Sequence, residues 1–348
     1  MKIKELQKIL SKKKTDFALF YNADYDKNEH NMVYFSQYKG IGVLVIPKDN
    51  FPFLIVPKME QKSAKEGNIK RIIVWDKEKR LFENVKFIIK KNNVKIAIDK
   101  NNFSLNAYKE LKKNFKLKTT DISKECDKLR QIKTKKEIEI IKKGCKISDE
   151  ILTKCIKQIK TFKTESEIKA HLENETKKRG CELAFSTIVA SGKNSSKAHH
   201  HTIDTKLNRG FCVIDFGIKY KDYCTDTTRT IYIGKITKKE KQIYDFLLKV
   251  QKDTIKSIKI NDKCSKINEY ARKSLKQYNK YFTHGLGHGF GIKIHELPNL
   301  TEKSKDVIQN NMVFTVEPGI YMKSFGIRIE DDILIEKNQV KILTRTRW

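Results

Sequence analysis

The amino-acid sequence predicts a small α/β domain over residues 1–125, followed by a larger domain of helices and strands over residues 126–348. Three observations support this division. The chain has 348 residues, whereas a single hydrophobic core stops growing at roughly 250–300 residues. Strand-like apolar runs alternate with amphipathic stretches through the first third of the chain. After residue 182, glycine-rich turns and short strand-like segments contain most of the Asp, Glu and His residues that interrupt apolar runs.

The first domain is predicted from this alternation of strands and helices. Its strand-like runs are bounded by Asn, Asp, Pro or Lys and lie at residues 16–22, 42–47, 51–57, 71–76 and 94–99. Its helical stretches, with apolar residues three and four positions apart, lie at residues 4–13, 78–91 and 104–115. Strands that alternate with helices are typical of an α/β fold.

The second domain is predicted to begin with a helical block. Residues 135–160 and 164–180 have the helical spacing of apolar side chains, and two more helices are expected near residues 239–258 and 264–278. Short strands are expected between these helices and after them.

The charge of the chain excludes few function classes by itself. The sequence has 74 Lys and Arg residues against 42 Asp and Glu, a formal net charge of +32. Such a surplus can indicate binding to nucleic acid or to an anionic membrane. Here it is mostly lysine spread along every segment, without a zinc finger, an RNP-type strand or a basic heptad region. We therefore expect weak, salt-sensitive binding to polyanions and no specific nucleic-acid partner.

Hydrophobic patterning and cysteine usage predict a cytoplasmic protein. No apolar run approaches the ~20 residues that a membrane-spanning helix needs, and no signal segment follows Met1, so no membrane partner is expected. An odd number of cysteines without a Cys-x-x-Cys pair is typical of reduced thiols, which we expect to be half-buried. The seven are Cys126, Cys145, Cys155, Cys181, Cys212, Cys224 and Cys264. Cys212 and Cys224 flank candidate ligands, but hard carboxylates fill the predicted site.

Two aspartates lie in a predicted hairpin over residues 211–234. Asp215 interrupts the apolar run FCVIDFG, and Asp226 lies on the return strand after a turn through residues 219–222. A buried carboxylate loses its hydration at high cost, and two adjacent carboxylates repel each other unless a cation lies between them. The pair therefore indicates a metal ion, whereas either aspartate alone is also explained by a turn cap or a lysine partner.

Three histidines cluster in a glycine-rich stretch over residues 283–300. His284, His288 and His295 occur there with glycines at positions 285, 287, 289 and 291. So much glycine excludes a regular helix and allows irregular strands to approach closely. Because histidine is the commonest transition-metal ligand, this stretch is predicted to line a metal site.

Two glutamates interrupt predicted strands further along the chain. Glu317 ends an apolar strand before a Pro-Gly turn. Glu330 lies in the segment 325–336, where period-two alternation is expected to put Arg328, Glu330 and Asp332 on one face of a single strand.

Four acids and one histidine on separate strands are best explained by a shared pair of divalent ions. The predicted ligands are Asp215, Asp226, His288, Glu317 and Glu330. Oxygen ligands with a single imidazole suit Mn²⁺, Co²⁺, Fe²⁺ or Zn²⁺, and carboxylates can bridge two ions ~3.5–4 Å apart. A purely structural account would need several unrelated buried ion pairs.

The motifs VIDFG, TDTTRT, HGLGHGFG, HE, VEPG and GIRIEDD occur in this order. In content and order they resemble the pita-bread metallopeptidases, the methionine aminopeptidase and prolidase superfamily, and specifically its Xaa-Pro peptidase branch of aminopeptidase P and prolidase. The resemblance covers the whole chain. It implies a creatinase-like α/β domain over 1–125 and an α+β pita-bread catalytic domain over 126–348.

Carried over by motif, the resemblance assigns the metal ligands individually. Asp215 would chelate one metal ion and Asp226 would bridge both. His288 and Glu317 would hold the other ion, and Glu330 would be the second bridge. The implied cofactor is two divalent ions, with manganese favoured over cobalt, zinc and iron.

The same resemblance implies roles in catalysis and substrate binding. His199, in SGKNSSKAHHH, matches a substrate-contacting histidine, although Ala198 stands where the family usually has proline and the adjacent His200 and His201 leave the register open by one position. His295 would contact substrate and stabilise the tetrahedral intermediate.

Three further residues complete the predicted site. His284 would line the same cleft, Arg328 resembles the arginine beside the bridging glutamate, and Glu317 would shuttle a proton.

The implied activity is that of a dinuclear-metal exopeptidase. It would hydrolyse the bond between an amino-terminal residue and proline, as an Xaa-Pro aminopeptidase or an Xaa-Pro dipeptidase, and would form a homodimer. Two alternatives stay open: an exopeptidase of the methionine aminopeptidase type, and a non-catalytic pita-bread protein that binds partners.

Overall fold

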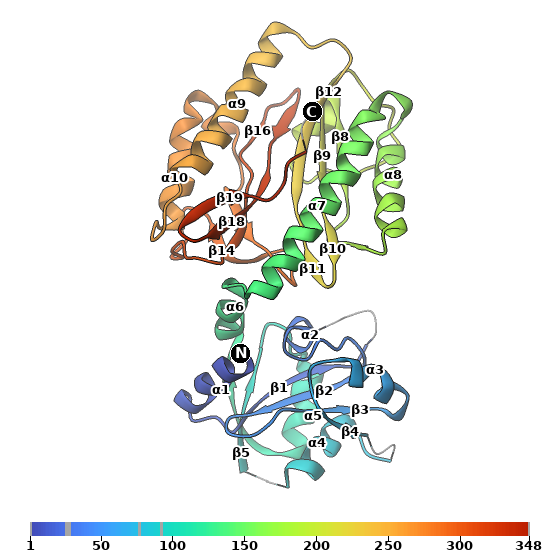
Figure 1. The fold of residues 1–348 in the computed structure, drawn as a ribbon, viewed down its shortest axis with the longest axis vertical. Coiled ribbons are helices and arrows are strands. Elements are labelled where there is room, and N and C mark those ends of the chain that lie inside the picture. Colours follow the sequence, from blue (N-terminus) through green and yellow to red (C-terminus); the bar gives the residue numbers. More distant parts are fainter. Residues whose placement is uncertain (1, 25–28, 76–77, 91–92, 347–348) are drawn as a thin grey trace. The chain divides into compact units, whose positions relative to one another are not determined.

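A computed structural model of the chain describes residues 2–24, 29–75, 78–90 and 93–346. Contacts divide the chain into two compact units, Met1–Leu129 and Arg130–Trp348 (Figure 1). The division falls inside helix α6 (Ser123–Gln131). Each unit has hydrophobic clusters of its own.

The first unit is built on a six-stranded sheet with the strand order β4-β3-β2-β1-β5-β6. Its strands are β1 (Phe17–Asn22), β2 (Gly42–Pro47), β3 (Phe53–Val56), β4 (Arg71–Val74), β5 (Asn93–Ile98) and β6 (Lys116–Asp121). The β1–β2–β3 strands pair antiparallel, whereas β3–β4, β1–β5 and β5–β6 pair parallel. The sequence analysis did not predict β6, whose lysines alternate with Leu and Thr at the edge of the sheet.

Helices cover both faces of this sheet. They are α1 (Lys2–Lys12), α2 (His30–Ser36), α3 (Gln61–Glu66), α4 (Leu81–Ile89) and α5 (Leu105–Asn114), together with α6. Successive side chains of β1 point to opposite faces, so Ala18 and Phe20 pack with α1, α2, α3 and α6, whereas Phe17 and Leu19 pack with α4 and α5. The predicted α/β fold is therefore confirmed.

The second unit has two halves. In the first half, residues 130–234, α7 (Lys135–Lys157) and α8 (Glu165–Lys178) pack on a sheet with the strand order β12-β9-β8. In the second half, residues 235–346, α9 (Lys238–Ser257) and α10 (Cys264–Ser274) pack on a five-stranded sheet with the order β14-β13-β15-β18-β19. Figure 1 shows the two pairs of helices on opposite sides of the strands that lie between them.

The strands of this unit are short and often interrupted. They are β7 (Glu182–Leu183), β8 (Ile188–Ser191), β9 (Gly210–Phe216), β10 (Ile218–Tyr220), β11 (Tyr223–Cys224), β12 (Thr227–Ile233), β13 (Gly287–Gly289), β14 (Glu296–Leu300), β15 (Val313–Val316), β16 (Gly319–Tyr321), β17 (Gly326–Arg328), β18 (Asp331–Glu336) and β19 (Gln339–Ile342). Three predicted ligands lie between consecutive strands: Asp226, Glu317 and Glu330.

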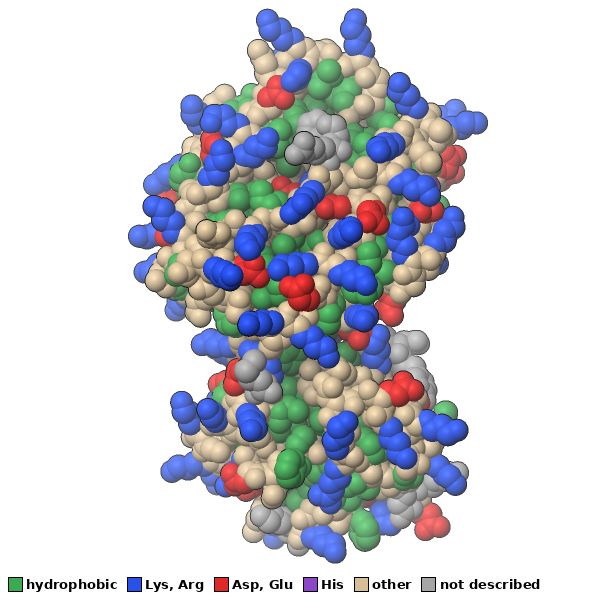
Figure 2. Space-filling model, in the orientation of Figure 1, with side chains coloured by type: hydrophobic (Ala, Val, Ile, Leu, Met, Phe, Trp, Pro, Cys, Tyr) green, Lys and Arg blue, Asp and Glu red, His purple; other side chains and the backbone are tan. Residues whose placement is uncertain are grey.

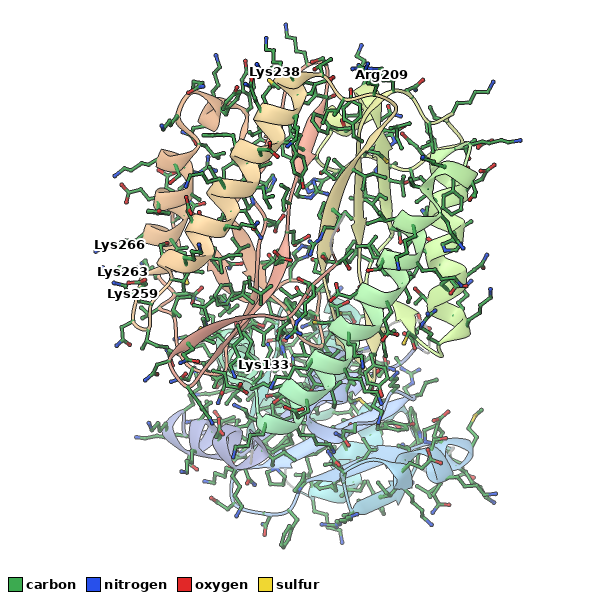
Figure 3. All side chains as sticks on the ribbon, turned by 45° about the horizontal axis from the view of Figure 1, so that its top comes forward. Lys133, Arg209, Lys238, Lys259, Lys263 and Lys266 are labelled. Atoms are coloured by element: carbon green, nitrogen blue, oxygen red, sulfur yellow. The ribbon has the colours of Figure 1, made fainter. Side chains whose placement is uncertain are left out.

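The lysines lie mostly on the surface. Figure 2 shows lysine and arginine side chains scattered over the visible face of each unit. Lys238, Lys259, Lys263 and Lys266 are exposed and point outward around the ends of α9 and α10 (Figure 3). Lys133 is different, because its side chain is 1% exposed and donates to Glu296 Oε2 at 3.0 Å.

Two further features are the burial of the cysteines and the length of the apolar helices. All seven cysteines are free thiols and all are buried, so the expectation of half-burial was wrong: six of them belong to hydrophobic clusters, which exclude water. Within the described residues, no helix is both long enough and apolar enough to span a membrane.

Candidate metal centre

Asp215 is held on the central strand of the first half. Strand β9 pairs antiparallel with β8 and β12, which places Asp215 opposite Ile188 and Thr228. Asp215 Oδ2 accepts a hydrogen bond from Arg328 Nη2 at 2.7 Å. Its Oδ1 is buried and has no hydrogen-bond partner among the described residues. A buried carboxylate oxygen without a donor is the kind of group that a cation satisfies.

Asp226 follows the turn of the predicted hairpin. The turn residues Lys221 and Asp222 have φ of 48° and 71°, and Asp226 lies between β11 and β12. The strands pair Asp215 with Thr228, so the two aspartates are not direct cross-strand partners as the simple hairpin suggested. The turn at Lys221 and Asp222 sets this register, and a Cβ on Gly217 would come within 2.1 Å of the Thr225 carbonyl oxygen.

His288 lies on β13, where glycines allow two other backbones to approach. A Cβ on Gly287 would lie 2.0 Å from the Thr315 carbonyl oxygen, and one on Gly289 would lie 2.1 Å from that of Leu297. The His288 Nδ1 hydrogen donates to the Gly289 carbonyl at 3.1 Å, which fixes the tautomer and leaves the Nε2 lone pair free for a metal ion.

The imidazole of His288 meets two carboxylates. Its Nε2 lies 3.5 Å from Asp226 Oδ2 and 3.6 Å from Glu317 Oε1. Burial, followed by the effect of His295, lowers the pKa of His288 to about 4, so the ring is neutral and these contacts are not ion pairs. Two ligand atoms that are each ~2.1 Å from one ion lie roughly 3.0–3.4 Å apart. His288 Nε2 therefore lies from each of these two oxygens at nearly the spacing of two ligands of one ion.

Glu317 and Glu330 lie at strand breaks in the second half. Glu317 follows β15, and its Oε1 accepts from Thr315 Oγ1 at 3.2 Å. Glu330 Oε2 accepts from Thr228 Oγ1 at 2.7 Å, and its backbone N–H donates to the Thr228 carbonyl at 3.2 Å. Both glutamates thereby take their orientation from a neighbouring threonine.

The expected continuous strand over residues 325–336 was wrong. The segment forms two strands, because β17 pairs with β16 while β18 pairs with β15 and β19. Glu330 lies at the break between them. Asp332 consequently does not share the cavity with Arg328 and Glu330: it is fully buried behind the site, where its Oδ2 accepts from the Asp226 N–H at 3.2 Å and from Cys145 Sγ at 3.3 Å.

The electrostatics of these acids indicate a missing positive charge. Burial, and then repulsion by Glu330 and Asp215, raises the pKa of Asp226 well above its ordinary value. Burial raises the pKa of Glu317 to about 8, and burial followed by repulsion from Glu317 and Asp215 strongly raises that of Glu330. A bound cation would reverse these shifts.

The donor set fits divalent metal ions. Ligand atoms of Asp226, His288 and Glu330 all lie within 4.8 Å of one another. Glu317 is within reach of His288, and the buried Asp215 Oδ1 lacks a donor. Carboxylate oxygens with one imidazole match the preferences of first-row divalent metals.

All five predicted ligands line one cavity of about 430 Å³, and the predicted substrate residues line it as well. His199 and His295 are exposed there, and the ring of His295 lies 4.3 Å from that of His288. Of the three consecutive histidines, His199 lines the cavity, whereas His200 is buried with its Nε2 2.9 Å from Glu165 Oε2. His201 is exposed and does not line the cavity.

Arg328 and His284 are joined through a tyrosine that the sequence analysis missed. The Tyr321 hydroxyl lies 2.7 Å from Arg328 Nη1 and 2.9 Å from His284 Nε2. Burial, followed by the charge of Arg328, lowers the pKa of His284 to about 4. Arg328 Nε also donates to Thr228 Oγ1 at 3.1 Å. Thr228 lies within the TDTTRT motif, whereas nothing in the sequence marked Tyr321.

A larger cavity of about 970 Å³ lies along α7 and the segment 341–346, and its lining contains none of the predicted site residues.

Comparison with known proteins identifies the family. The model of metallopeptidase family M24 matches residues 139–337, and that of the creatinase/prolidase N-terminal domain matches residues 2–132. The chain is 37% identical to the Xaa-Pro dipeptidase of Pyrococcus furiosus over 328 residues, which is 91% of each protein. Its fold matches the prolidase of Pyrococcus horikoshii OT3 with a TM-score of 0.89 and 34% identity, covering 99% of this chain and 98% of the other.

Another similar structure is named for a different activity. The X-Pro aminopeptidase of Thermotoga maritima MSB8 matches with a TM-score of 0.88 and 32% identity over 96% of each chain. These matches confirm the resemblance and fold inferred from the motifs. The family is one of metallopeptidases, which implies divalent metal ions as cofactor. The chain therefore belongs to metallopeptidase family M24 and has the creatinase/prolidase amino-terminal domain.

Proposed function

We propose that the chain is a two-metal exopeptidase that hydrolyses the bond between an amino-terminal residue and a following proline. The observation that carries the proposal is the convergence of Asp226, His288 and Glu330 in a cavity that Asp215 and Glu317 also line. The names of similar proteins, Xaa-Pro dipeptidase and X-Pro aminopeptidase, support proline in the second position. Dipeptides and longer peptides are both within this class.

The ligand assignment is part of the proposal. Asp215 and Asp226 would hold one ion, and His288 and Glu317 would hold the other, with Asp226 and Glu330 bridging the two. When bound, the ions supply Lewis acidity that lowers the pKa of the attacking water and polarises the scissile carbonyl. Manganese is the proposed metal, since most of the ligand atoms are hard carboxylate oxygens.

The protein's own side chains would bind substrate and move protons. Glu317 lies beside the proposed ion site and would carry a proton from water to the leaving imino nitrogen. His295 and His199, which are exposed at the cavity, would stabilise the developing oxyanion. Arg328 would orient Asp215 through its 2.7 Å contact, and His284 would contact substrate. The substrate amino group would lie near Asp215.

The assembly and location of the protein are further proposals. We infer a homodimer from the family resemblance. The seven buried free thiols support a reducing compartment, and we infer the cytoplasm.

The test compares substrates and metals directly. Metal-free protein is reloaded separately with Mn²⁺, Co²⁺ or Zn²⁺. Each form is then given an Xaa-Pro dipeptide, a longer Xaa-Pro-led peptide, the same peptide with alanine in place of proline, and Met-Ala-Ser. We expect release of the first residue from the proline substrates and little from the others. Faster cleavage of Met-Ala-Ser would favour the methionine aminopeptidase alternative.

Metal content separates the remaining alternative. Elemental analysis should find about two metal ions per chain in the active protein. A protein that folds, binds no stoichiometric metal and cleaves nothing would be the non-catalytic binding protein.

A further inference from the structure

The proposed metal centre lies where the two halves of the second unit meet. Asp215 and Asp226 come from the first half, whereas His288, Glu317 and Glu330 come from the second. The distances among the ligands therefore depend on how firmly β12 of the first half is held against the segment that includes Glu330. One buried arginine, Arg229, donates hydrogen bonds to Glu330, Asp331 and Thr346 of the second half.

Arg229 is on β12, three residues after Asp226, and is 4% exposed. It does not line the cavity, so it does not touch substrate. Its Nη1 donates to Thr227 Oγ1 at 3.1 Å and to the Thr228 carbonyl at 3.0 Å within its own strand. The same nitrogen donates across the junction to the backbone carbonyl of Glu330.

The other two nitrogens of Arg229 reach further into the second half. Nη2 donates to Asp331 Oδ1 at 2.6 Å, and Nε donates to the Thr346 carbonyl at 2.8 Å. Asp331 is itself fixed, since Gln251 Nε2 of α9 donates to its Oδ2 at 2.7 Å and Thr344 Oγ1 donates to its Oδ1 at 2.8 Å.

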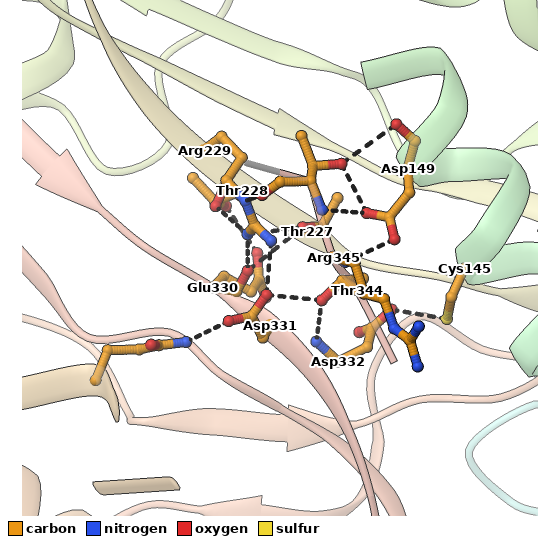
Figure 4. Close-up of polar contacts among 12 residues, drawn as sticks. Cys145, Asp149, Thr227, Thr228, Arg229, Glu330, Asp331, Asp332, Thr344 and Arg345 are labelled. Atoms are coloured by element: carbon orange, nitrogen blue, oxygen red, sulfur yellow. Dashed lines mark hydrogen bonds and ion pairs between the residues drawn. The ribbon is translucent and has the colours of Figure 1, made fainter. Parts of the chain in front are cut away.

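The network also reaches α7. Asp149 accepts from the backbone N–H groups of Arg345 and Thr346 at 2.6 and 3.0 Å. Thr346 thus joins Asp149 to Arg229, and Figure 4 shows the contacts of Arg229 with Glu330 and Asp331. Hydrogen bonds therefore run without interruption from a helix of the first half to a helix of the second, and Arg229 in this chain also contacts the backbone of a predicted ligand.

We propose that Arg229 is a positioning residue for the metal centre: its guanidinium sets the spacing between Asp226 on one half and Glu330 on the other. The inference rests on the proposed two-metal site. The planar guanidinium suits the task, because it donates in several fixed directions at once, whereas a lysine ammonium is a single point of charge on a flexible chain. Groups that orient metal ligands typically change metal affinity by about 10–100-fold when they are lost.

Two residues that precede Arg229 in the sequence also join the two halves. Thr228 Oγ1 donates to the Glu330 carboxylate at 2.7 Å, and the Asp226 N–H donates to Asp332 at 3.2 Å. A displacement of β12 from Glu330 would therefore disturb both bridging carboxylates together. A purely structural ion pair would stabilise the fold and leave the affinity for metal unchanged.

The test measures metal binding by calorimetry on metal-free protein titrated with Mn²⁺. In Arg229→Lys we expect the affinity for the two ions to fall at least about tenfold, with the far-ultraviolet circular dichroism of the folded protein retained. Asp331→Asn keeps the shape of its partner and removes the charge, and we expect a smaller loss of about threefold. Leu172→Ala, a buried position on α8 outside the network, is the matched control for general loss of stability.

Four outcomes overturn a proposal. If Arg229→Lys and Asp331→Asn melt early, as Leu172→Ala does, but bind Mn²⁺ with wild-type affinity, then Arg229 has a structural role only. If Arg229→Lys does not fold, Asp331→Asn carries the test, and wild-type affinity in that variant overturns the inference. Wild-type protein that binds fewer than two ions overturns it too. Wild-type protein that binds two ions but cleaves no Xaa-Pro peptide overturns the proposed function alone.

Discussion

Two clusters of buried charge in the second unit differ in how their charges are balanced. In the first, Glu296 lies 2.9 Å from Arg130 Nε and 3.0 Å from Lys133 Nζ. Burial by itself would raise the pKa of Glu296, but Lys133 and Arg130 outweigh it and hold the pKa below its ordinary value. This cluster contains its own counter-charges and fixes the start of β14, directly after His295.

The second cluster is the candidate metal centre, where the acids outnumber the cations. Among the described residues that line the cavity, Arg328 is the one arginine or lysine beside Asp215, Asp226, Glu317 and Glu330. Here the pKa values of Asp226, Glu317 and Glu330 are raised, not lowered. The direction of these shifts distinguishes a structural ion cluster from a site that needs cations from solution.

The largest expected effect comes from removing a bridging ligand. Glu330→Gln should abolish peptidase activity, by about 1,000-fold or more, and weaken metal binding in parallel, because the amide cannot bridge two ions as a carboxylate does. In metal-free protein the same change should raise the melting temperature, since it relieves repulsion by Glu317 and Asp215. Calorimetric scans with EDTA and with Mn²⁺ check both effects. Full activity and metal content in the variant would contradict the bridging assignment.

The corresponding change in the other cluster should have the opposite sign. Glu296→Gln removes the carboxylate that both Arg130 and Lys133 contact, and we expect a loss of about 3–5 kcal/mol in the free energy of unfolding, with or without metal. Urea denaturation measures it. Asp245→Asn breaks the exposed Lys241–Asp245 pair, whose side chains are 62% and 54% exposed, and should cost below about 1 kcal/mol. Equal effects in the two variants would contradict the comparison.

The two clusters also predict different pH dependences. In metal-free protein, folded Glu317 keeps its proton up to a pKa of about 8, whereas the unfolded chain releases it near the ordinary 4.5. The folded state therefore binds more protons in this window, and the free energy of unfolding should fall as the pH rises from about 4.5 to 8. Glu296 has a lowered pKa, so its contribution to the free energy of unfolding should instead be lost as the pH falls below its ordinary pKa.

Melting temperatures between about pH 6 and 8.5, with EDTA and with Mn²⁺, test this sign. We expect the decline with EDTA, a weaker decline in Glu317→Gln, and little dependence with metal bound. A melting temperature that rises with pH in the metal-free protein would show that these carboxylates are already compensated.

The sequence predicted more of the site than of the local structure that builds it. Four of the proposed ligands were found because an acid inside an apolar run is costly and therefore conspicuous, and His288 was found because three histidines cluster in a glycine-rich stretch. The positions of Asp226 and Glu330 at strand breaks were missed, since breaks arise from close approaches, such as that of Gly217 to Thr225, which periodicity does not record. The alternation over 325–336 looked continuous because Ile327, Ile329 and Ile333 are all buried in one hydrophobic cluster, although β17 and β18 belong to different sheets.

Residues that act through hydrogen bonds were the hardest to predict. Tyr321, Asp332 and Glu296 touch their partners across long sequence separations, and no local pattern distinguishes them from ordinary strand residues. Strand β6 was missed for a related reason: at the edge of the sheet, an alternation of lysine with Leu and Thr is weak evidence for a strand.

The smallest expected effect concerns the neutral side of the metal centre. Tyr321→Phe removes the hydroxyl that joins Arg328 to His284 and leaves the Arg328–Asp215 contact at 2.7 Å in place. Because no proposed ligand is lost, metal content should stay at the wild-type level, and kcat should fall by roughly threefold to tenfold through looser positioning of His284. Steady-state kinetics on an Xaa-Pro peptide, with elemental analysis of the same samples, measures both. Loss of metal from this variant would show that the Tyr321 hydroxyl also helps to hold Asp215, and it would then count with the groups that support the metal ligands.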